Sequence, residues 1–277
     1  MVKIFTVMYI LCSVYSTSPD IASPAFSQGI LEVEANIAQS LEKVEEVQTK
    51  LEIPDIKDYF AELKSLGLYK DESKDATLNK RNAVIRFQSI CNMIPTGKWD
   101  EKCQTSLIKI KTTNIQFNDS ITSPPTEEKW FVLNKTKRIL TYYHKDKVIK
   151  KYPVAIGKPS TKTPSGKYTI VSKVINPTWG GGGYAKAVKG GSPANPLGYR
   201  WMGLSYKDGS SVGIHGNNSP YSIGKEISHG CIRMINSDVE ELFNITSLKS
   251  VVWIGTEKEL KELGILQLEL LEESINH

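Results

Sequence analysis

The sequence lacks any uninterrupted run of about 18 or more apolar residues, which excludes a polytopic membrane protein. Excess charge of one sign is also small, because the net charge of +5 at pH 7 is too low to indicate a nucleic-acid-binding protein. Aromatic residues are not lacking: 5 Trp, 12 Tyr and 7 Phe are spread along the chain and exclude low-complexity disorder. The 277 residues can therefore bury one large core or two smaller ones.

The positive charge is concentrated in the second half of the chain. Residues 129–256 hold 19 Lys and Arg against 6 Asp and Glu, whereas residues 31–53 are rich in glutamate. A basic domain favours an anionic partner such as nucleic acid, a lipid surface or an anionic wall polymer. Solvated lysines on strand faces explain the same pattern, so both interpretations remain open.

The first residues have the plan of a secretory signal peptide. Lys3 precedes a short apolar run that ends at Tyr15, and Ser, Thr, Pro and Ala follow up to Ser27. The run is too short for a stable membrane anchor. A buried first strand is the alternative. We therefore expect residues 1–27 to be a signal peptide and the protein to be exported, peripheral to a membrane at most.

Cysteine is scarce, with four residues in the chain. Cys12 would leave with the signal, and Cys91 and Cys103 lie 12 residues apart on two expected helices. In an oxidising compartment these two are candidates for a disulfide, which would leave Cys231 as an odd thiol. An odd cysteine in an exported protein is a weak sign of a reactive role.

Helical periodicity dominates the first half of the chain. Residues 29–53 carry apolar residues at heptad spacing up to Pro54, which predicts a helix. Residues 54–112 are predicted to form a small all-α module of three helices, the last of them capped by Asp100.

This module resembles the peptidoglycan-binding-like domain family. The resemblance implies binding of cell-wall glycan and peptide, or a spacer role, and a cysteine pair is not a general feature of that family. The residues that carry it are Leu63-x-x-Leu66-Gly67-Leu68-Tyr69, Ala83-Val84-x-x-Phe87-Gln88, Thr96-Gly97-x-Trp99-Asp100 and Leu107.

After a predicted linker at residues 113–128, the apolar pattern changes to short β-rich runs separated by Gly and Pro turns. Such a pattern is typical of an all-β sandwich or barrel. Residues 257–277 are expected to form an amphipathic tail helix. The predicted strands are 129–133, 138–144, 148–156, 168–175 and 251–255.

Histidine is as scarce as cysteine, and its positions are informative. His277 is terminal and His144 is expected to be solvated, whereas His215 and His229 lie 16 and two residues before Cys231. A thiol with a pKa of about 8.5 is mostly protonated at neutral pH. A histidine within hydrogen-bond reach would take the proton and hold the thiolate as an ion pair.

The neighbours of Cys231 extend this interpretation. Gly230 leaves room for a substrate carbonyl, and the N–H groups of Gly230 and Cys231 could stabilise an oxyanion. Arg233 suits a carboxylate. Three alternatives remain: a buried, inert cysteine, a zinc site built on the two histidines and the cysteine, and Arg233 as an ordinary surface charge. Zinc is disfavoured because the sequence offers three ligands and no CxxC or HExxH partner.

Residues 129–256 resemble the L,D-transpeptidase catalytic domain, the YkuD family. The resemblance implies a β-sandwich with the cysteine in a loop-covered cleft, and it implies neither a metal ion nor an organic cofactor. The matching residues are Ile214-His215-Gly216-Asn217, Ser228-His229-Gly230-Cys231-Ile232-Arg233-Met234, Thr163-Pro164-Ser165-Gly166-x-Tyr168 and Asn236-x-Asp238-Val239.

Roles in the site follow from this resemblance residue by residue. It implies that Cys231 is the nucleophile, His215 the proton acceptor and donor, and His229 a supporting residue; Arg233 is a candidate for holding a substrate carboxylate. A backbone carbonyl is expected to hold the imidazole, because the motif contains no acidic partner. Three further residues are expected to contact substrate, namely Gly216, Asn217 and Ser228. Residues 176–200 could form a lid or an insertion loop.

The resemblance implies acyl transfer on peptidoglycan stem peptides, with release of D-alanine and formation of a cross-link. It also implies acylation of Cys231 by carbapenem-type β-lactams. The same residues would serve an L,D-carboxypeptidase or endopeptidase, and an inactive wall-binding protein is the alternative of another class.

Overall fold

The computed structural model describes residues 58–183, 185–207 and 211–272. The chain divides into two units, Met1–Asp55 and Ile56–His277, and the described residues all belong to the second unit. The expected signal peptide at 1–27 and the expected helix at 29–53 lie outside the described residues. Among the helices that are described, none is long and apolar enough to cross a membrane.

Three helices open the described part of the chain: α3 (Tyr59–Ser65), α4 (Ala76–Ile90) and α5 (Glu101–Thr113). Each begins after an aspartate whose carboxylate accepts backbone N–H groups of the first turn, and Asp100 does so for Cys103 as expected. Their apolar faces share one buried cluster that includes Leu63, Phe87 and Leu107. The three helices predicted from periodicity are present.

Cys91 and Cys103 are both buried in this cluster, and both are free thiols. The predicted disulfide is therefore wrong for this structure. Burial raises the pKa of both thiols, and Gln88 Nε2 lies 3.7 Å from the sulfur of Cys103. Each cysteine acts as a small apolar side chain of the core.

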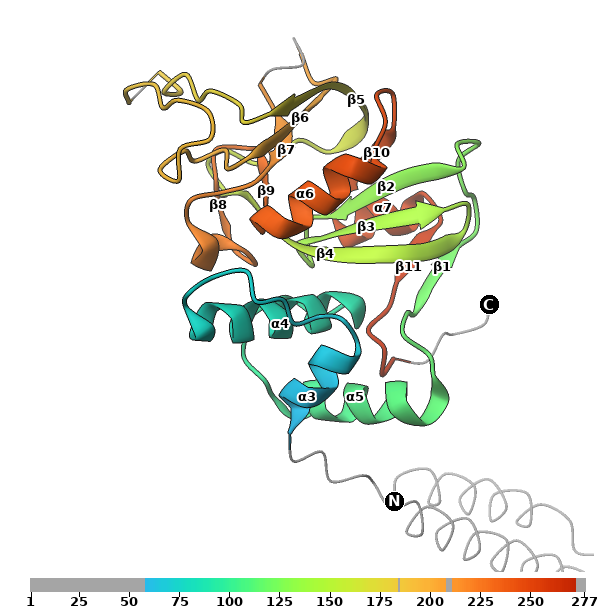
Figure 1. Ribbon diagram of the computed structural model, residues 1–277. Coiled ribbons are helices and arrows are strands. Elements are labelled where there is room, and N and C mark those ends of the chain that lie inside the picture. The colour runs from blue at the N-terminus through green and yellow to red at the C-terminus, as the bar shows by residue number, and fades with distance from the viewer. Residues whose placement is uncertain (1–57, 184, 208–210, 273–277) are drawn as a thin grey trace, which may run out of the picture. The chain divides into compact units, whose positions relative to one another are not determined.

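Nine of the strands that follow form one sheet that closes on itself, and Figure 1 shows how these strands are arranged. The order is β3-β2-β10-β5-β6-β7-β9-β4-β8, and β3 pairs with β4 as well. The strands are β2 (Lys129–Asn134), β3 (Ile139–His144), β4 (Lys147–Gly157), β5 (Gly166–Ile175), β6 (Arg200–Leu204), β7 (Gly213–His215), β8 (Glu226–Ser228), β9 (Ile232–Met234) and β10 (Val251–Gly255).

Closure makes the architecture a barrel. Of the two architectures that the residue pattern left open, the barrel is present, and the sandwich that the resemblance implied is not. The reason is the length of β4, which has 11 residues. Residues Lys147–Pro153 pair with β3, whereas Val154 and Ala155 pair with β9. One strand thus joins the two ends of the sheet and removes most of its free edge. The five predicted strands are all present, as β2, β3, β4, β5 and β10.

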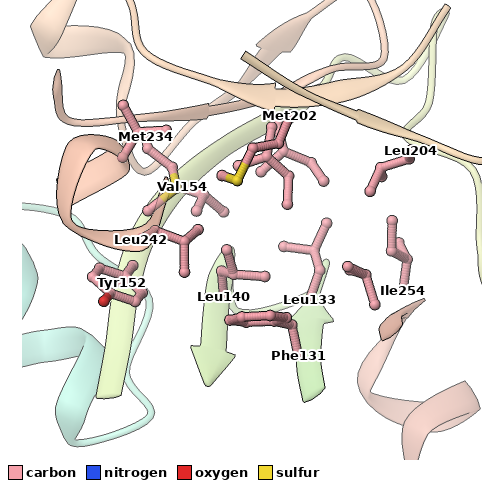
Figure 2. Close-up of a cluster of buried hydrophobic side chains, with 14 of the residues drawn as sticks. Phe131, Leu133, Leu140, Tyr152, Val154, Met202, Leu204, Met234, Leu242 and Ile254 are labelled. Atoms are coloured by element: carbon pink, nitrogen blue, oxygen red, sulfur yellow. The ribbon is translucent and has the colours of Figure 1, made fainter. Parts of the chain in front are cut away.

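The barrel interior is filled by side chains at alternate positions of facing strands. In Figure 2, Phe131, Leu133 and Leu140 point toward Met202 and Met234 from the opposite side of the barrel. Helix α6 (Asn236–Ile245) adds Val239 and Leu242 to the same cluster. This interior core fixes the register of the short strands β6, β7 and β9, which carry the candidate site.

Residues 257–272 differ from the predicted tail helix, and the last residues of that prediction, 273–277, lie outside the described residues. Helix α7 (Glu257–Glu262) is short, and β11 (Ile265–Gln267) follows it. Strand β11 pairs antiparallel with β1 (Asp119–Ile121), which lies within the predicted linker. Leu260 and Ile265 pack on the outer face of β2 and β10. The leucines that suggested one amphipathic helix are therefore divided between a short helix, a turn and a strand.

A buried ion pair joins these segments. The Lys151 ammonium lies 2.7 Å from the Asp119 carboxylate, and the two side chains are 0% and 1% exposed. Asn92 after α4 and Gln267 of β11 also donate hydrogen bonds to Asp119. Although burial raises the pKa of Asp119, the Lys151 charge and these hydrogen bonds lower it, so the carboxyl is ionised. The pair connects α4, β1, β4 and β11.

Replacing Asp119 by Asn is expected to lower the free energy of unfolding by about 3–5 kcal/mol, because Lys151 would keep a buried charge without its partner. Urea denaturation followed by circular dichroism measures the change. Glu269→Gln is the matched control, because it breaks the exposed pair with Lys102 and should cost less than about 1 kcal/mol. Equal, small losses in the free energy of unfolding for both variants would show that the buried pair stabilises the fold no more than an exposed pair does.

Candidate active site

The candidate site lies on the pocket-facing side of three neighbouring strands. Strand β7 runs parallel to β9 with His215 opposite Arg233, and it runs antiparallel to β6 with Trp201 opposite His215. Side chains at positions i and i+2 share a face, so Cys231, just before β9, lies on the side of Arg233. Alternate residues such as Ile214 face the barrel core. The period-two pattern thus brings Trp201, His215, Arg233 and Cys231 together.

The imidazole of His215 is oriented by its own chain. Nδ1 lies 2.6 Å from the Gly216 carbonyl oxygen, and because a carbonyl can only accept, Nδ1 carries the proton. Nε2 is then the nitrogen that can accept a proton. The expected backbone carbonyl is confirmed. The Trp201 ring, which the sequence interpretation missed, stacks on the imidazole with centroids 5.7 Å apart.

His215 is neutral in the resting site. Burial lowers the pKa of His215 to about 4; the hydrogen bond to Gly216 opposes this shift, and the charge of Arg233 adds to it. Protonation would place a cation in a site that is 3% exposed and already faces a guanidinium. The imidazole is therefore available as a general base above about pH 4.

Gly216 and Asn217 hold the histidine rather than facing the pocket. Asn236 Oδ1 accepts the backbone N–H of Asn217, and Asn236 Nδ2 donates to the Asn217 carbonyl, both at 2.9 Å. The Asn217 amide donates to the Met234 carbonyl at 2.6 Å. A Cβ at Gly216 would lie 2.1 Å from Asn236 Oδ1, so this position requires glycine. These bonds already use the polar groups of both residues, and their expected contacts with substrate stay a prediction.

Hydrogen bonds from two hydroxyl groups hold the loop before Cys231. Ser228 Oγ donates to the Cys231 carbonyl at 2.6 Å and accepts the Gly230 N–H at 3.2 Å. Thr163 Oγ1 donates to the Gly230 carbonyl at 2.9 Å. Gly230 has φ +118°, a conformation that other residues rarely adopt. The Gly230 N–H is thus bonded to Ser228, its expected role as an oxyanion donor stays a prediction, and Ser228 is a positioning residue.

The Cys231 thiol is partly exposed and protonated. Its sulfur lies 3.9 Å from the Ser211 carbonyl, to which the S–H can donate. Burial raises the pKa of the thiol, while a backbone hydrogen bond from Gly213 and the charge of Arg233 oppose the shift. The expected thiolate–imidazolium ion pair is therefore wrong at rest, because burial disfavours both charged forms.

A pocket of about 550 Å³ opens over this row of side chains. Residues 177–182 and 196–197 form one wall, so the 176–200 segment bounds the cleft instead of extending away from it. His229 is exposed and also lines the pocket. The lining residues are Val174, Pro177, Thr178, Trp179, Gly180, Gly182, Pro196, Leu197, Trp201, Ser211, His215, Ser228, His229, Cys231 and Arg233.

The geometry does not assemble a metal site. Within the described ranges, no three His, Cys, Asp or Glu side chains lie close enough together to hold a metal ion. What the pocket offers is a thiol, a neutral imidazole and a guanidinium. This set can deprotonate a nucleophile, attack a carbonyl and attract an anionic group.

Alkylation of Cys231 by iodoacetamide is expected to accelerate at a higher pH than that of an ordinary cysteine, because burial raises the pKa of the thiol. A preformed ion pair would instead give a reactive plateau near neutral pH. Mass spectrometry of the Cys231 peptide between pH 5 and 10 measures the profile. His215→Gln should leave the profile nearly unchanged, because the neutral imidazole contributes no charge. A reactive plateau near neutral pH that is lost in His215→Gln would contradict the protonated thiol and support the thiolate–imidazolium ion pair.

Ser228→Ala removes the hydroxyl that bonds both Gly230 and Cys231. We expect the free energy of unfolding to fall by about 1–3 kcal/mol, because the Gly230 N–H and the Cys231 carbonyl lose their hydrogen-bond partner. Thermal denaturation measures the effect. Ser160→Ala, an exposed position in the adjacent loop, serves as the control. Wild-type stability of the Ser228 variant would contradict the role of this hydroxyl in holding the loop.

Comparison with known proteins identifies the family of the chain. The family model of the YkuD L,D-transpeptidase catalytic domain matches residues 128–254. YqjB of Bacillus subtilis (strain 168), provisionally assigned as an L,D-transpeptidase, is 37% identical over 146 residues, which are 52% of this chain and 81% of the relative.

Solved structures give more distant similarities. An L,D-transpeptidase from Mycobacterium tuberculosis H37Rv is 18% identical, with a TM-score of 0.39 over 46% of this chain and 57% of that one. The L,D-transpeptidase LdtMt1 in complex with imipenem is 20% identical, with a TM-score of 0.37 over 46% and 59%. The chain thus spans less than two thirds of these two solved proteins. By its catalytic-domain match and its similarity to YqjB, the chain belongs to the YkuD L,D-transpeptidase family.

Proposed function

We propose that this protein is a cysteine-dependent L,D-transpeptidase that cross-links peptidoglycan stem peptides. One observation carries the proposal: Cys231, His215 and Arg233 face a single pocket, and the Gly216 carbonyl leaves His215 Nε2 unprotonated. Family membership supports the reaction class. The donor would be a tetrapeptide stem that ends in D-alanine.

The first half-reaction would acylate the enzyme. The sulfur of Cys231 attacks the carbonyl that joins the third residue to the terminal D-alanine, while His215 Nε2 takes the thiol proton. The neutral resting pair fits this order, because proton transfer accompanies attack and needs no standing thiolate. The C–N bond then breaks, and D-alanine leaves with the proton from His215.

Two groups would stabilise the charges in this step. The Cys231 N–H is the candidate oxyanion donor, because the Gly230 N–H is bonded to Ser228. The Arg233 guanidinium lines the pocket, and among the side chains that the structure describes it has no carboxylate within ion-pair distance. It is suited to the carboxylate of the donor stem.

The second half-reaction would decide between transfer and hydrolysis. An amine of a second stem attacks the thioester, His215 accepts its proton, and Cys231 is released as the cross-link forms. Trp201 beside His215 and the 177–182 wall narrow the access of water. Water in place of the amine would give an L,D-carboxypeptidase or endopeptidase with the same residues.

The setting of the enzyme is part of the proposal. We propose export through the 1–27 segment and action in the cell wall. In the same proposal, the helices of the 54–112 segment contact glycan and peptide of the wall. A carbapenem would acylate Cys231, because its strained amide carbonyl presents the same electrophile as the donor stem.

Incubation with purified disaccharide-tetrapeptide, followed by mass spectrometry, tests the proposal. The expected product is a dimer that has lost one D-alanine. A tripeptide alone would indicate a carboxypeptidase, and no change on any stem would indicate a wall-binding protein. Cys231→Ala should abolish turnover, lowering it by more than about 10³-fold, while sedimentation with wall fragments is retained. Turnover that survives in this variant would exclude Cys231 as the nucleophile.

A further inference from the structure

The segment between the two catalytic motifs packs between strand β4 of the barrel and helix α4. It runs from Asn218, after the His215 motif, to Ile227, before the Cys231 motif, and includes the 3-10 turn η1 (Pro220–Ser222). His215 lies a few residues before this segment and Cys231 a few residues after it, so the segment connects the two catalytic motifs directly.

Arg81 on α4 contacts this loop directly. Its Nη2 donates to the Ile223 carbonyl at 2.7 Å, and its guanidinium lies 5.7 Å from the centre of the Tyr221 ring. Tyr221 Oη donates to the carboxylate of Asp75, the N-cap residue of α4, at 2.8 Å. The start of α4 thus holds two consecutive turns of the loop.

Close packing reinforces these polar contacts. Gly224 has φ +90°, and a Cβ on it would lie 2.1 Å from the Pro95 carbonyl oxygen. Ile223 is fully buried in a small cluster with Ile85 of α4, Ala155 of β4 and Ile235. The cluster joins α4, the barrel and the loop. Helix α4 therefore helps to position the loop together with β4, whose Val154 carbonyl accepts the Gly224 N–H.

Helix α4 also contacts the segment that holds the His215 motif. Arg86 of α4 is 4% exposed and donates to Asp238 of α6 at 3.0 Å. Ser237 bonds to Glu72, which also pairs with Arg86 at 2.8 Å. Ser237 and Asp238 directly follow Asn236, the residue that holds the His215 loop.

We propose that α4 is a built-in part of the catalytic machinery, and that Arg81 is a positioning residue that sets the distance between Cys231 and His215. The proposal rests on the proposed function for the reaction whose rate it controls. It gives the helical segment a role at the active site that does not require wall binding. Arg81 acts through the 218–227 loop and does not touch the reacting atoms.

The test compares Arg81→Met with Lys74→Met, which removes an exposed cation just before α4. Arg81→Met should lower kcat on disaccharide-tetrapeptide on the order of tenfold and leave KM within about twofold, because small misplacements slow chemistry more than binding. Amide hydrogen exchange of residues 213–233 should accelerate in the same variant. Lys74→Met should match the wild type in all three readouts.

Two further variants separate positioning from unfolding. Arg81→Lys should restore part of kcat, because an ammonium can still donate to the Ile223 carbonyl. Tyr221→Phe removes one exposed hydroxyl and should give a smaller loss of kcat with an unchanged thermal midpoint.

The outcomes distinguish this proposal from the proposed function. Wild-type kcat and wild-type exchange in Arg81→Met would overturn the role of α4. A loss of kcat that follows the thermal midpoint, without rescue by Arg81→Lys, would also overturn it. If the wild-type protein itself shows no turnover, the proposed function is overturned instead. The hydrogen exchange of Arg81→Met would still decide whether α4 holds the loop.

Discussion

The parallel pairing of β7 with β9 is the constraint on which the site depends. It sets His215 opposite Arg233, and the period of two then places Cys231 on the same side and Ile214 in the core. A shift of one residue would exchange these faces and bury the polar groups. The interior core shown in Figure 2 opposes such a shift, because its side chains come from strands on both sides of the closed sheet.

The site is assembled by pairing between strands that are far apart in the sequence. This explains which of its residues could be predicted and which could not. Cys231, His215 and Arg233 could be found because they stand in short, unusual motifs. Trp201 could not, because nothing local indicates that it lies opposite His215 across two antiparallel strands. Thr163 is 67 residues from Gly230 along the chain, and its hydrogen bond exists only once the barrel has closed.

The fold shows the same division. Strands with strong alternation and helices with aspartate caps were predictable, since both signals are local. Closure of the barrel was not, because it depends on one long strand, β4, having different partners along its length. The strand pair β1–β11 was missed for a related reason. It is stabilised by a buried ion pair whose members, Asp119 and Lys151, come from segments that look like a linker and an ordinary strand.

The protonated resting state of Cys231 has a consequence for the lifetime of the enzyme. Peroxides and other oxidants attack thiolates far faster than thiols, and the products, from sulfenic to sulfonic acid, are progressively harder to reverse. A nucleophile whose S–H bond is kept by burial until a base removes the proton is therefore shielded from such damage between turnovers. The low-dielectric pocket that delays ionisation also preserves the sulfur.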